Sequence, residues 1–165
     1  MRATEPTHRD IAEFFRLGLL AGVCDLSAIV CWADSVLTAE PSPPYAFCDL
    51  SICESQPVSS VVCLLREVPG TPTPDLPIFM LLGFCYQLAE SGSLSLSEKL
   101  VRLHHMARTE HFPDRIDSAL TNLDEDLYLA REGIYGTVTE VERAFTDYLA
   151  RYKSYAPDNL TGVSK

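Results

Sequence analysis

One pattern of apolar and polar positions occurs three times along the chain. An apolar run with helical spacing ends at a glycine, a short turn follows, and a hydroxyl residue opens the next apolar run. Glycine ends helices readily because it enters the left-handed conformation without strain, and Ser or Thr caps the first turn of a helix. The pattern predicts helices joined in hairpins. The glycines and the hydroxyl residues that follow them are Gly22 and Ser27, Gly92 and Ser95, and Gly133 and Thr137.

The apolar periodicity predicts an all-α fold of seven to eight helices, packed as antiparallel hairpins around a central apolar helix over residues 76–90. The segment 45–53 fits a short helix or a strand; we choose a helix, because a lone strand would leave its backbone groups unpaired. The uneven spacing of the three glycines disfavours a repeat array of the tetratricopeptide kind, which is kept as an alternative. The expected helices cover residues 7–21, 27–39, 45–53, 58–68, 76–90, 95–110, 115–132 and 137–155.

A chain of 165 residues suits one domain. We expect a single helical domain over residues 1–155, with proline-rich loops at 40–44 and 69–77, and a flexible polar tail over 156–165. Thr7 is the expected cap of the first helix. Ser95-x-x-Glu98 and Thr137-x-x-Glu140 have the spacing of capping boxes, in which the two side chains satisfy each other's backbone amides.

Acidic residues outnumber basic ones by 23 to 13, and the formal net charge is −10. The excess is even, with −5 in residues 1–70 and −5 in 71–165. Such a surface repels nucleic-acid phosphates and anionic membranes, and it favours encounter with a basic partner. We therefore expect neither nucleic acid nor membrane as a partner.

The N-terminal residues lack the apolar segment of a signal peptide, and the most apolar stretch, 76–89, is too short to span a bilayer. A cytoplasmic location is therefore expected. The six cysteines form no Cys-x-x-Cys pair and lie in apolar surroundings, which favours buried free thiols in a reducing compartment.

No motif for catalysis, phosphate binding, a metal or a cofactor stands out. His104 and His111 are seven residues apart and are expected on one face of the sixth helix, but they lack the His-Glu-x-x-His core of a zinc site. The enzyme alternative needs Asp34 and Asp49 to converge with His104 or His105. We expect no enzymatic activity.

Acidic side chains of the last two helices are the best candidates for a partner-binding surface. Three consecutive helical residues, Asp124 to Asp126, spread over about 200° of the helix and cannot all bind one cation. They suit a docking patch for a basic protein, although a solvated acidic face is the simpler interpretation. The candidate residues are Asp117, Asp124, Glu125, Asp126, Glu132 and Glu140.

The single tryptophan, Trp32, lies on an apolar helix face. This position favours a place in the core, with an exposed interface anchor as the alternative.

Several short phrases along the chain resemble one family of uncharacterised small acidic bacterial proteins. The phrases are Gly18–Gly22, Trp32-Ala33-Asp34, Pro43-Pro44-Tyr45, Asp49-Leu50-Ser51, Leu64–Gly70, and Leu129–Gly133 with Tyr135-Gly136. The resemblance implies a bacterial cytoplasmic origin and one fold, and it carries over no functional residue. In size and charge the chain is also similar to immunity proteins that neutralise bacterial toxins.

These features predict a non-enzymatic bacterial protein-binding domain that acts like an immunity protein or antitoxin on a basic partner, with a toxin as one candidate. The alternatives are a helical secretion chaperone with an apolar groove, or an enzyme with a carboxylate and histidine pocket. The sequence leaves the oligomeric state open.

Overall fold

The computed structural model describes residues 5–157 and confirms an all-α fold. These residues form eight α-helices and two 3₁₀ segments, and no strand lies among them. The chain divides into two compact units, one with the described residues up to Pro77 and Pro157, the other spanning Ile78–Ala156. The predictions of a single domain over 1–155 and of hairpins around a central helix stay predictions. Each unit is described by itself.

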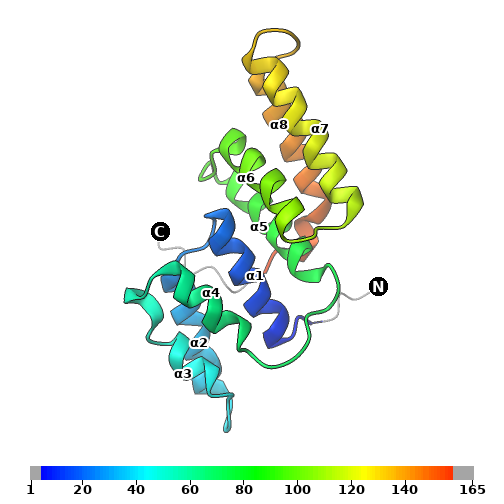
Figure 1. The fold of residues 1–165 in the computed structure, drawn as a ribbon. Helices are drawn as coiled ribbons and strands as arrows, with labels where there is room; N and C mark the ends of the chain where they lie inside the picture. The colour runs from blue at the N-terminus through cyan, green and yellow to red at the C-terminus, as the bar shows by residue number, and fades with distance from the viewer. Residues whose placement is uncertain (1–4, 158–165) are drawn as a thin grey trace. The chain divides into compact units, whose positions relative to one another are not determined.

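The first unit contains four α-helices and a 3₁₀ segment (Figure 1). Helix α1 packs against α4, and α3 packs against both α2 and α4. The elements are α1 (His8–Ala21), α2 (Leu26–Ala39), α3 (Ala46–Leu50), η1 (Cys53–Ser55) and α4 (Val58–Arg66). The segment 45–53, ambiguous in the sequence, is therefore helical over most of its length.

An aromatic cluster forms the core of the first unit. The ring of Trp32 lies 5.3 Å from that of Phe15 and 5.0 Å from that of Phe47, in tilted and edge-to-face arrangements that aromatic pairs favour. All three side chains are buried. The expectation that Trp32 belongs to the core is confirmed.

Two side chains of α1 connect this helix to later parts of the first unit. Arg9 donates from Nη1 to the carbonyl oxygen of Leu65, at 2.6 Å, near the end of α4. The buried carboxylate of Asp10 accepts a hydrogen bond from the backbone amide of Thr73 in the proline-rich loop. This hydrogen bond therefore connects the proline-rich loop to the start of α1.

The second unit contains the remaining helices, beginning within the first turn of α5. Its elements are α5 (Leu76–Glu90), α6 (Leu96–Thr109), α7 (Asp114–Arg131), α8 (Val138–Leu149) and η2 (Ala150–Tyr155). Helices α6, α7 and α8 pack against one another, and α7 and α8 run antiparallel along each other (Figure 1). The buried side chains of Leu103, Leu120, Phe145 and Leu149 belong to this unit.

Helix α5 approaches the end of the unit closely at Gly83. A Cβ atom at Gly83 would lie 2.4 Å from the carbonyl oxygen of Tyr152 and 2.8 Å from the amide of Ala156. Ala156, the first residue of the predicted tail, is buried. The small glycine permits the contact. The rest of the predicted tail, residues 158–165, lies outside the described residues.

The helix caps follow the sequence in some places and not in others. Thr7 caps α1 in a capping box with Asp10, Gly22 takes the left-handed conformation with φ 68°, and Thr137 and Glu140 form the expected capping box of α8. At α2 the cap is Asp25, whose side chain accepts from the amide of Ala28. The expectation of a Ser27 cap is wrong, because the carboxylate of Asp25 caps the helix two residues earlier.

The capping box expected at Ser95 and Glu98 is also wrong. Ser95 is the first residue before α6, but its side chain accepts no cap hydrogen bond. Its ψ of 95° differs from the 153° of Thr137, so the hydroxyl is aimed differently. Glu98 lies next to Lys99, with 3.7 Å between Oε1 and Nζ, and does not complete the box.

Candidate functional site

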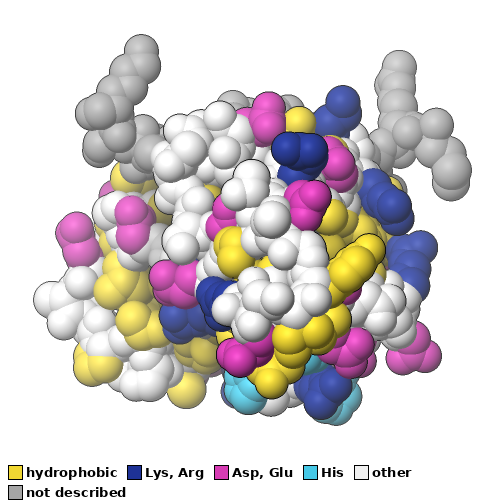
Figure 2. Space-filling view, turned by 90° about the horizontal axis from the view of Figure 1, so that it is seen from above, with side chains coloured by type: hydrophobic (Ala, Val, Ile, Leu, Met, Phe, Trp, Pro, Cys, Tyr) yellow, Lys and Arg dark blue, Asp and Glu magenta, His cyan; other side chains and the backbone are white. Residues whose placement is uncertain are grey.

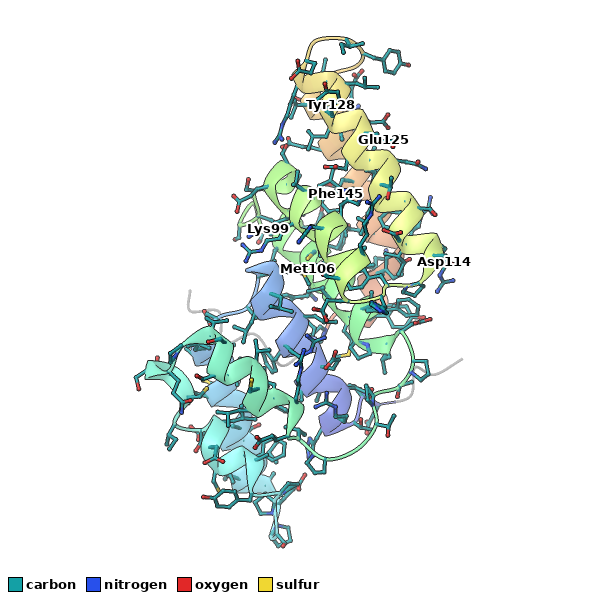
Figure 3. The ribbon with its side chains drawn as sticks, in the orientation of Figure 1. Lys99, Met106, Asp114, Glu125, Tyr128 and Phe145 are labelled. Carbon is teal, nitrogen blue, oxygen red and sulfur yellow. The ribbon has the colours of Figure 1, made fainter. Side chains whose placement is uncertain are left out.

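The end of the α7–α8 pair carries the most exposed large apolar side chains of the second unit. Tyr128 is 62% exposed, Ile134 66% and Tyr135 75%. Tyr128 lies in the last turns of α7, near Glu125 on the same helix, while Phe145 of α8 lies inside the unit (Figure 3). Such side chains at one end of a helical pair are candidates for contact with a partner.

The loop that carries Ile134 and Tyr135 is fixed by its own backbone. The amide of Gly133 donates to the carbonyl of Ala130 at 3.2 Å, and the amide of Ile134 donates to the carbonyl of Leu129 at 2.9 Å. This pair of bonds is a Schellman motif, and it requires the left-handed conformation that Gly133 adopts with φ 67°.

The capping box of α8 fixes the other side of the loop. Oε2 of Glu140 accepts from the amide of Thr137 at 2.9 Å, and Oγ1 of Thr137 accepts from the amide of Glu140 at 3.2 Å. Gly136 between the two motifs also has a positive φ, 68°. The two exposed side chains therefore stand on a loop whose backbone is held by hydrogen bonds at both ends.

An open hollow of about 420 Å³ lies beside this loop. Its lining combines two carboxylates with an aromatic ring, backbone and small apolar side chains. The lining residues are Asp126, Tyr135, Gly136, Thr137, Glu140, Val141 and Ala144. We call this depression the hairpin hollow.

The acidic residues that we expected to bind a partner differ in their surroundings. Glu125, Asp126, Glu132 and Glu140 are exposed around the loop. Figure 2, which looks onto this end of the second unit, shows Asp and Glu side chains between exposed hydrophobic ones. We call the surface formed by these four residues with Tyr128, Ile134 and Tyr135 the hairpin end.

The other two expected residues are less exposed than these four. Nδ1 of His104 lies 3.0 Å from Oδ2 of Asp124, so Asp124 links α7 to α6. Asp117 is half-buried, and its Oδ1 is buried without a hydrogen-bond partner. We therefore leave Asp117 and Asp124 out of the hairpin end.

His104 also meets a hydroxyl group. Oγ1 of Thr121 lies 3.2 Å from Nε2, so hydroxyl, imidazole and carboxylate follow one another as in a catalytic triad. Acyl transfer would also need amide donors for the oxyanion. Thr121 lies in the middle of α7, where backbone amides donate to carbonyls of the same helix. We interpret the group as a polar contact between α6 and α7.

The other groups of the enzyme alternative belong to different units. Asp34 is exposed on α2 and Asp49 is half-buried on α3, both in the first unit, whereas His104 and His105 belong to the second.

The expectation that His104 and His111 share a helix face is wrong. Helix α6 ends at Thr109, and His111 has the left-handed φ of 56° that lets Phe112 donate to the carbonyl of Ala107.

The cysteines also differ from expectation. Cys53 and Cys85 are buried, Cys24 is half-buried, and Cys31, Cys48 and Cys63 are exposed. The prediction of buried thiols fails for the last three because a helical residue next to a core position can still face solvent. Burial raises the pKa of the Cys53 thiol, and it raises the pKa of Cys85 to about 12.

Residues 5–157 contain no group of three or more His, Cys, Asp or Glu side chains placed to hold a metal ion. Within the same residues no helix combines the length and apolar character that crossing a membrane requires.

The exposed apolar residues of the hairpin end were missed by the sequence analysis. Ile134 and Tyr135 stand between Gly133 and Gly136, which is a loop position from which a side chain cannot join a helical apolar stripe. Tyr128 lies off the stripe of α7 that contains Leu120 and Leu127. The loop position of Ile134 and Tyr135 and the position of Tyr128 off the apolar stripe could both have been recognised in the sequence.

Comparison with protein-family models, curated proteins and solved structures found no match. The resemblance of the short phrases to a bacterial family stays a prediction.

Proposed function

We propose that the protein is a non-enzymatic binding protein for a basic protein partner, which it contacts through the hairpin end. One observation carries the proposal. Three large apolar side chains, Tyr128, Ile134 and Tyr135, are exposed within eight residues of sequence, and several exposed carboxylates lie within three residues of them in the sequence. Isolated exposed apolar residues are ordinary on protein surfaces, whereas a group of them marks an interaction site more often.

The types of side chain suit a protein interface. Tyrosine is enriched among the residues that contribute most to binding, because its ring buries a large area and its hydroxyl keeps a hydrogen bond. Tyr128 and Tyr135 provide two such rings, and Ile134 provides a purely apolar contact. Truncation of one residue of this kind typically costs about 2 kcal/mol or more of binding free energy when it sits at the centre of an interface.

The hydrogen bonds of the loop favour binding as well. Ordering a flexible loop on association costs free energy, and a loop that is already fixed avoids most of that cost. The Schellman motif at Gly133 and the capping box at Thr137 fix the backbone on both sides of Tyr135. The side chains alone then have to be immobilised on binding.

The charge of the hairpin sets the chemistry of the partner. Residues 114–149 contain nine acidic and three basic residues, so this segment has a net charge of −6. Exposed carboxylates accelerate encounter with a basic surface and slow encounter with an acidic one, and salt screens both effects. A basic partner is therefore favoured at this surface.

The proposal extends to a more specific hypothesis, in which the partner is a basic bacterial toxin and the protein neutralises it in the cytoplasm by covering a basic surface. The acidic charge and the small size of the chain support this hypothesis. Neutralisation of this type needs no chemistry from the neutraliser. It needs a surface that excludes the toxin's own target.

Selection of short random peptides displayed on phage tests the binding proposal. Peptides selected on the protein should be rich in Lys and Arg and should contain apolar residues, because both complement the hairpin end. The double variant Ile134→Ser with Tyr135→Ser should weaken their binding by about tenfold or more. Their association rate should fall as salt is added.

A matched double variant separates this proposal from the chaperone alternative. Tyr45 and Ile52 are 76% and 70% exposed in the first unit, and this pair is the observation that favours a chaperone that holds apolar segments. Selected peptides that are apolar and uncharged, and that lose binding in Tyr45→Ser with Ile52→Ser only, would favour the chaperone. Basic peptides that bind the Ile134 and Tyr135 variant unchanged would contradict the hairpin end as the binding surface.

A further inference from the structure

The hairpin hollow has the lining of a receptor for one long cationic side chain. It brings together the carboxylates of Asp126 from α7 and Glu140 from α8, the ring of Tyr135 and the apolar side chains of Val141 and Ala144. A basic side chain needs anionic acceptors for its head and an apolar surface for its methylene stem. The hollow supplies both within about 420 Å³, which lies near the small end of ligand sites.

Both carboxylates remain available to a ligand. The two bonds that Glu140 accepts from Thr137 use the same oxygen, Oε2, so Oε1 is left to accept from a ligand. The ion pairs of residues 5–157 involve neither Asp126 nor Glu140. The lining itself contains no Lys or Arg that would neutralise them.

Two features of the lining distinguish a guanidinium from an ammonium group. A guanidinium is planar and weakly hydrated, so it stacks on an aromatic ring and donates in parallel to a carboxylate, whereas an ammonium ion keeps its water more strongly. Tyr135, Asp126 and Glu140 line the same hollow. The capping box holds Glu140 in place, which suits recognition by a planar group with fixed donor directions.

We infer that the hairpin hollow binds an arginine side chain of the partner, between the ring of Tyr135 and the carboxylates of Asp126 and Glu140. The inference rests on the proposed function, since the arginine belongs to the basic protein that contacts the hairpin end. It adds the identity of one partner side chain and the place where it enters. The exposed Ile134, next to Tyr135 in the loop, then contacts the partner beside that arginine.

An NMR titration with three matched small probes tests the inference on the full chain. The probes are the N-acetyl methylamides of arginine, of lysine and of citrulline, a neutral isostere of arginine. The arginine probe should shift the backbone amide signals of Gly136, Thr137 and Glu140, with a dissociation constant of about 1–10 mM for so small a ligand. The citrulline probe should leave these signals unchanged, and the lysine probe should bind at least about threefold more weakly.

Two charge variants with the same change of net charge provide the control. Asp126→Asn should weaken binding of the arginine probe by about fivefold to tenfold, because it removes a charged acceptor of the hollow. Asp147→Asn, at an exposed position of α8 outside the lining, should change it by less than about twofold. Equal losses in the two variants would mean a general charge effect and would overturn the inference.

The outcomes separate the inference from the proposed function. If basic peptides bind the hairpin end but the arginine probe shifts none of the three amide signals at up to about 50 mM, the arginine site is wrong and the proposed function stands. Equal binding of lysine and arginine probes would also overturn the assignment of a guanidinium. If no basic peptide binds the hairpin end, the proposed function fails whatever the probe does.

Discussion

The carboxylate of Asp10 accepts a hydrogen bond from the backbone amide of Thr73, with 2.6 Å between Oδ1 and N, across 63 residues of sequence. Thr7 donates to the same carboxylate from its backbone amide and from its hydroxyl, at 2.8 and 2.7 Å. One buried side chain therefore completes the cap of α1 and holds the proline-rich loop in place. The rotamer and the charge of Asp10 affect two elements of the first unit.

The pH dependence of stability should show the contribution of Asp10. Burial alone raises the pKa of this carboxyl, but the hydrogen bonds from Thr73 and Thr7 outweigh it, and the net pKa lies below its ordinary value. A group whose folded pKa is lowered stabilises the fold above its unfolded pKa, near 3.8, and that stability is lost as pH falls through the folded pKa. Acidification below about pH 4 should therefore destabilise the first unit through Asp10.

The variant Asp10→Asn isolates this effect. It should lower the free energy of unfolding by about 2 kcal/mol at neutral pH, because an amide places a donor against the donors of Thr7. It should also flatten the decline in stability below pH 4. The buried Trp32 lies in the same unit, so its fluorescence in urea reports the transition. Asp25→Asn at an exposed cap is the control and should cost less than about 0.5 kcal/mol.

Gly83 should tolerate alanine worse than an ordinary helical glycine does. Alanine is intrinsically better in a helix by about 1 kcal/mol, but here its Cβ would meet the backbone of Tyr152 and Ala156. Because backbone cannot turn aside as a side chain does, we expect Gly83→Ala to lower the melting temperature by about 5 °C or more, measured by circular dichroism.

Gly92→Ala is the matched control for this substitution. Gly92 has a φ of 72°, and a Cβ there would meet nothing within 4 Å. Its cost is limited to the left-handed backbone of a non-glycine residue, about 1–2 kcal/mol. A Gly83→Ala protein as stable as the wild type would show that η2 can move away from α5 at little cost.

Local sequence rules predicted the helix ends correctly where the hydrogen-bonding groups of the cap lie close together in the sequence. Gly22 in the left-handed conformation and the boxes at Thr7 and Thr137 each depend on residues within four positions. The bond from Asp10 to Thr73 could not be predicted in this way, because nothing in either local sequence marks a partner 63 residues away. Its geometry depends on the packing of α1 against α4.

The hairpin end was predicted in part. The sequence identified Asp126 and Glu140 by charge, but charge alone did not separate them from Asp124, which binds His104 across α6 and α7. Ile134 was not considered from the sequence, although its position between Gly133 and Gly136 marks a loop residue. The hollow itself depends on how closely α7 and α8 pack, which the predicted hairpin does not fix.

The six thiols should fall into distinct reactivity classes. An exposed thiol meets a reagent directly, whereas Cys85 is buried and its pKa is raised to about 12. At pH 8 the reactive thiolate would then be about one part in ten thousand of Cys85. Mass spectrometry after a short treatment with a thiol reagent should find Cys31, Cys48 and Cys63 modified and Cys53 and Cys85 unmodified.

Unfolding supplies the control for this experiment. In strong denaturant all six cysteines should react, and the difference between folded and unfolded labelling measures the protection of each site. Rapid modification of Cys85 in the folded protein would contradict its burial in the second unit.

The two sequences with the spacing of a capping box, at Ser95 and at Thr137, should differ in their contribution to stability. Thr137 accepts from the amide of Glu140 at 3.2 Å and Glu140 accepts in return, so Thr137→Ala should cost about 1 kcal/mol. Ser95 makes no such bond, so Ser95→Ala should change stability by less than about 0.5 kcal/mol. Both hydroxyls precede helices of the same unit, so urea unfolding followed by circular dichroism compares them under one set of conditions. An equal loss of stability in the two variants would mean that Ser95 caps α6 in solution. If neither variant loses stability, the capping box at Thr137 does not support the loop that presents Tyr135.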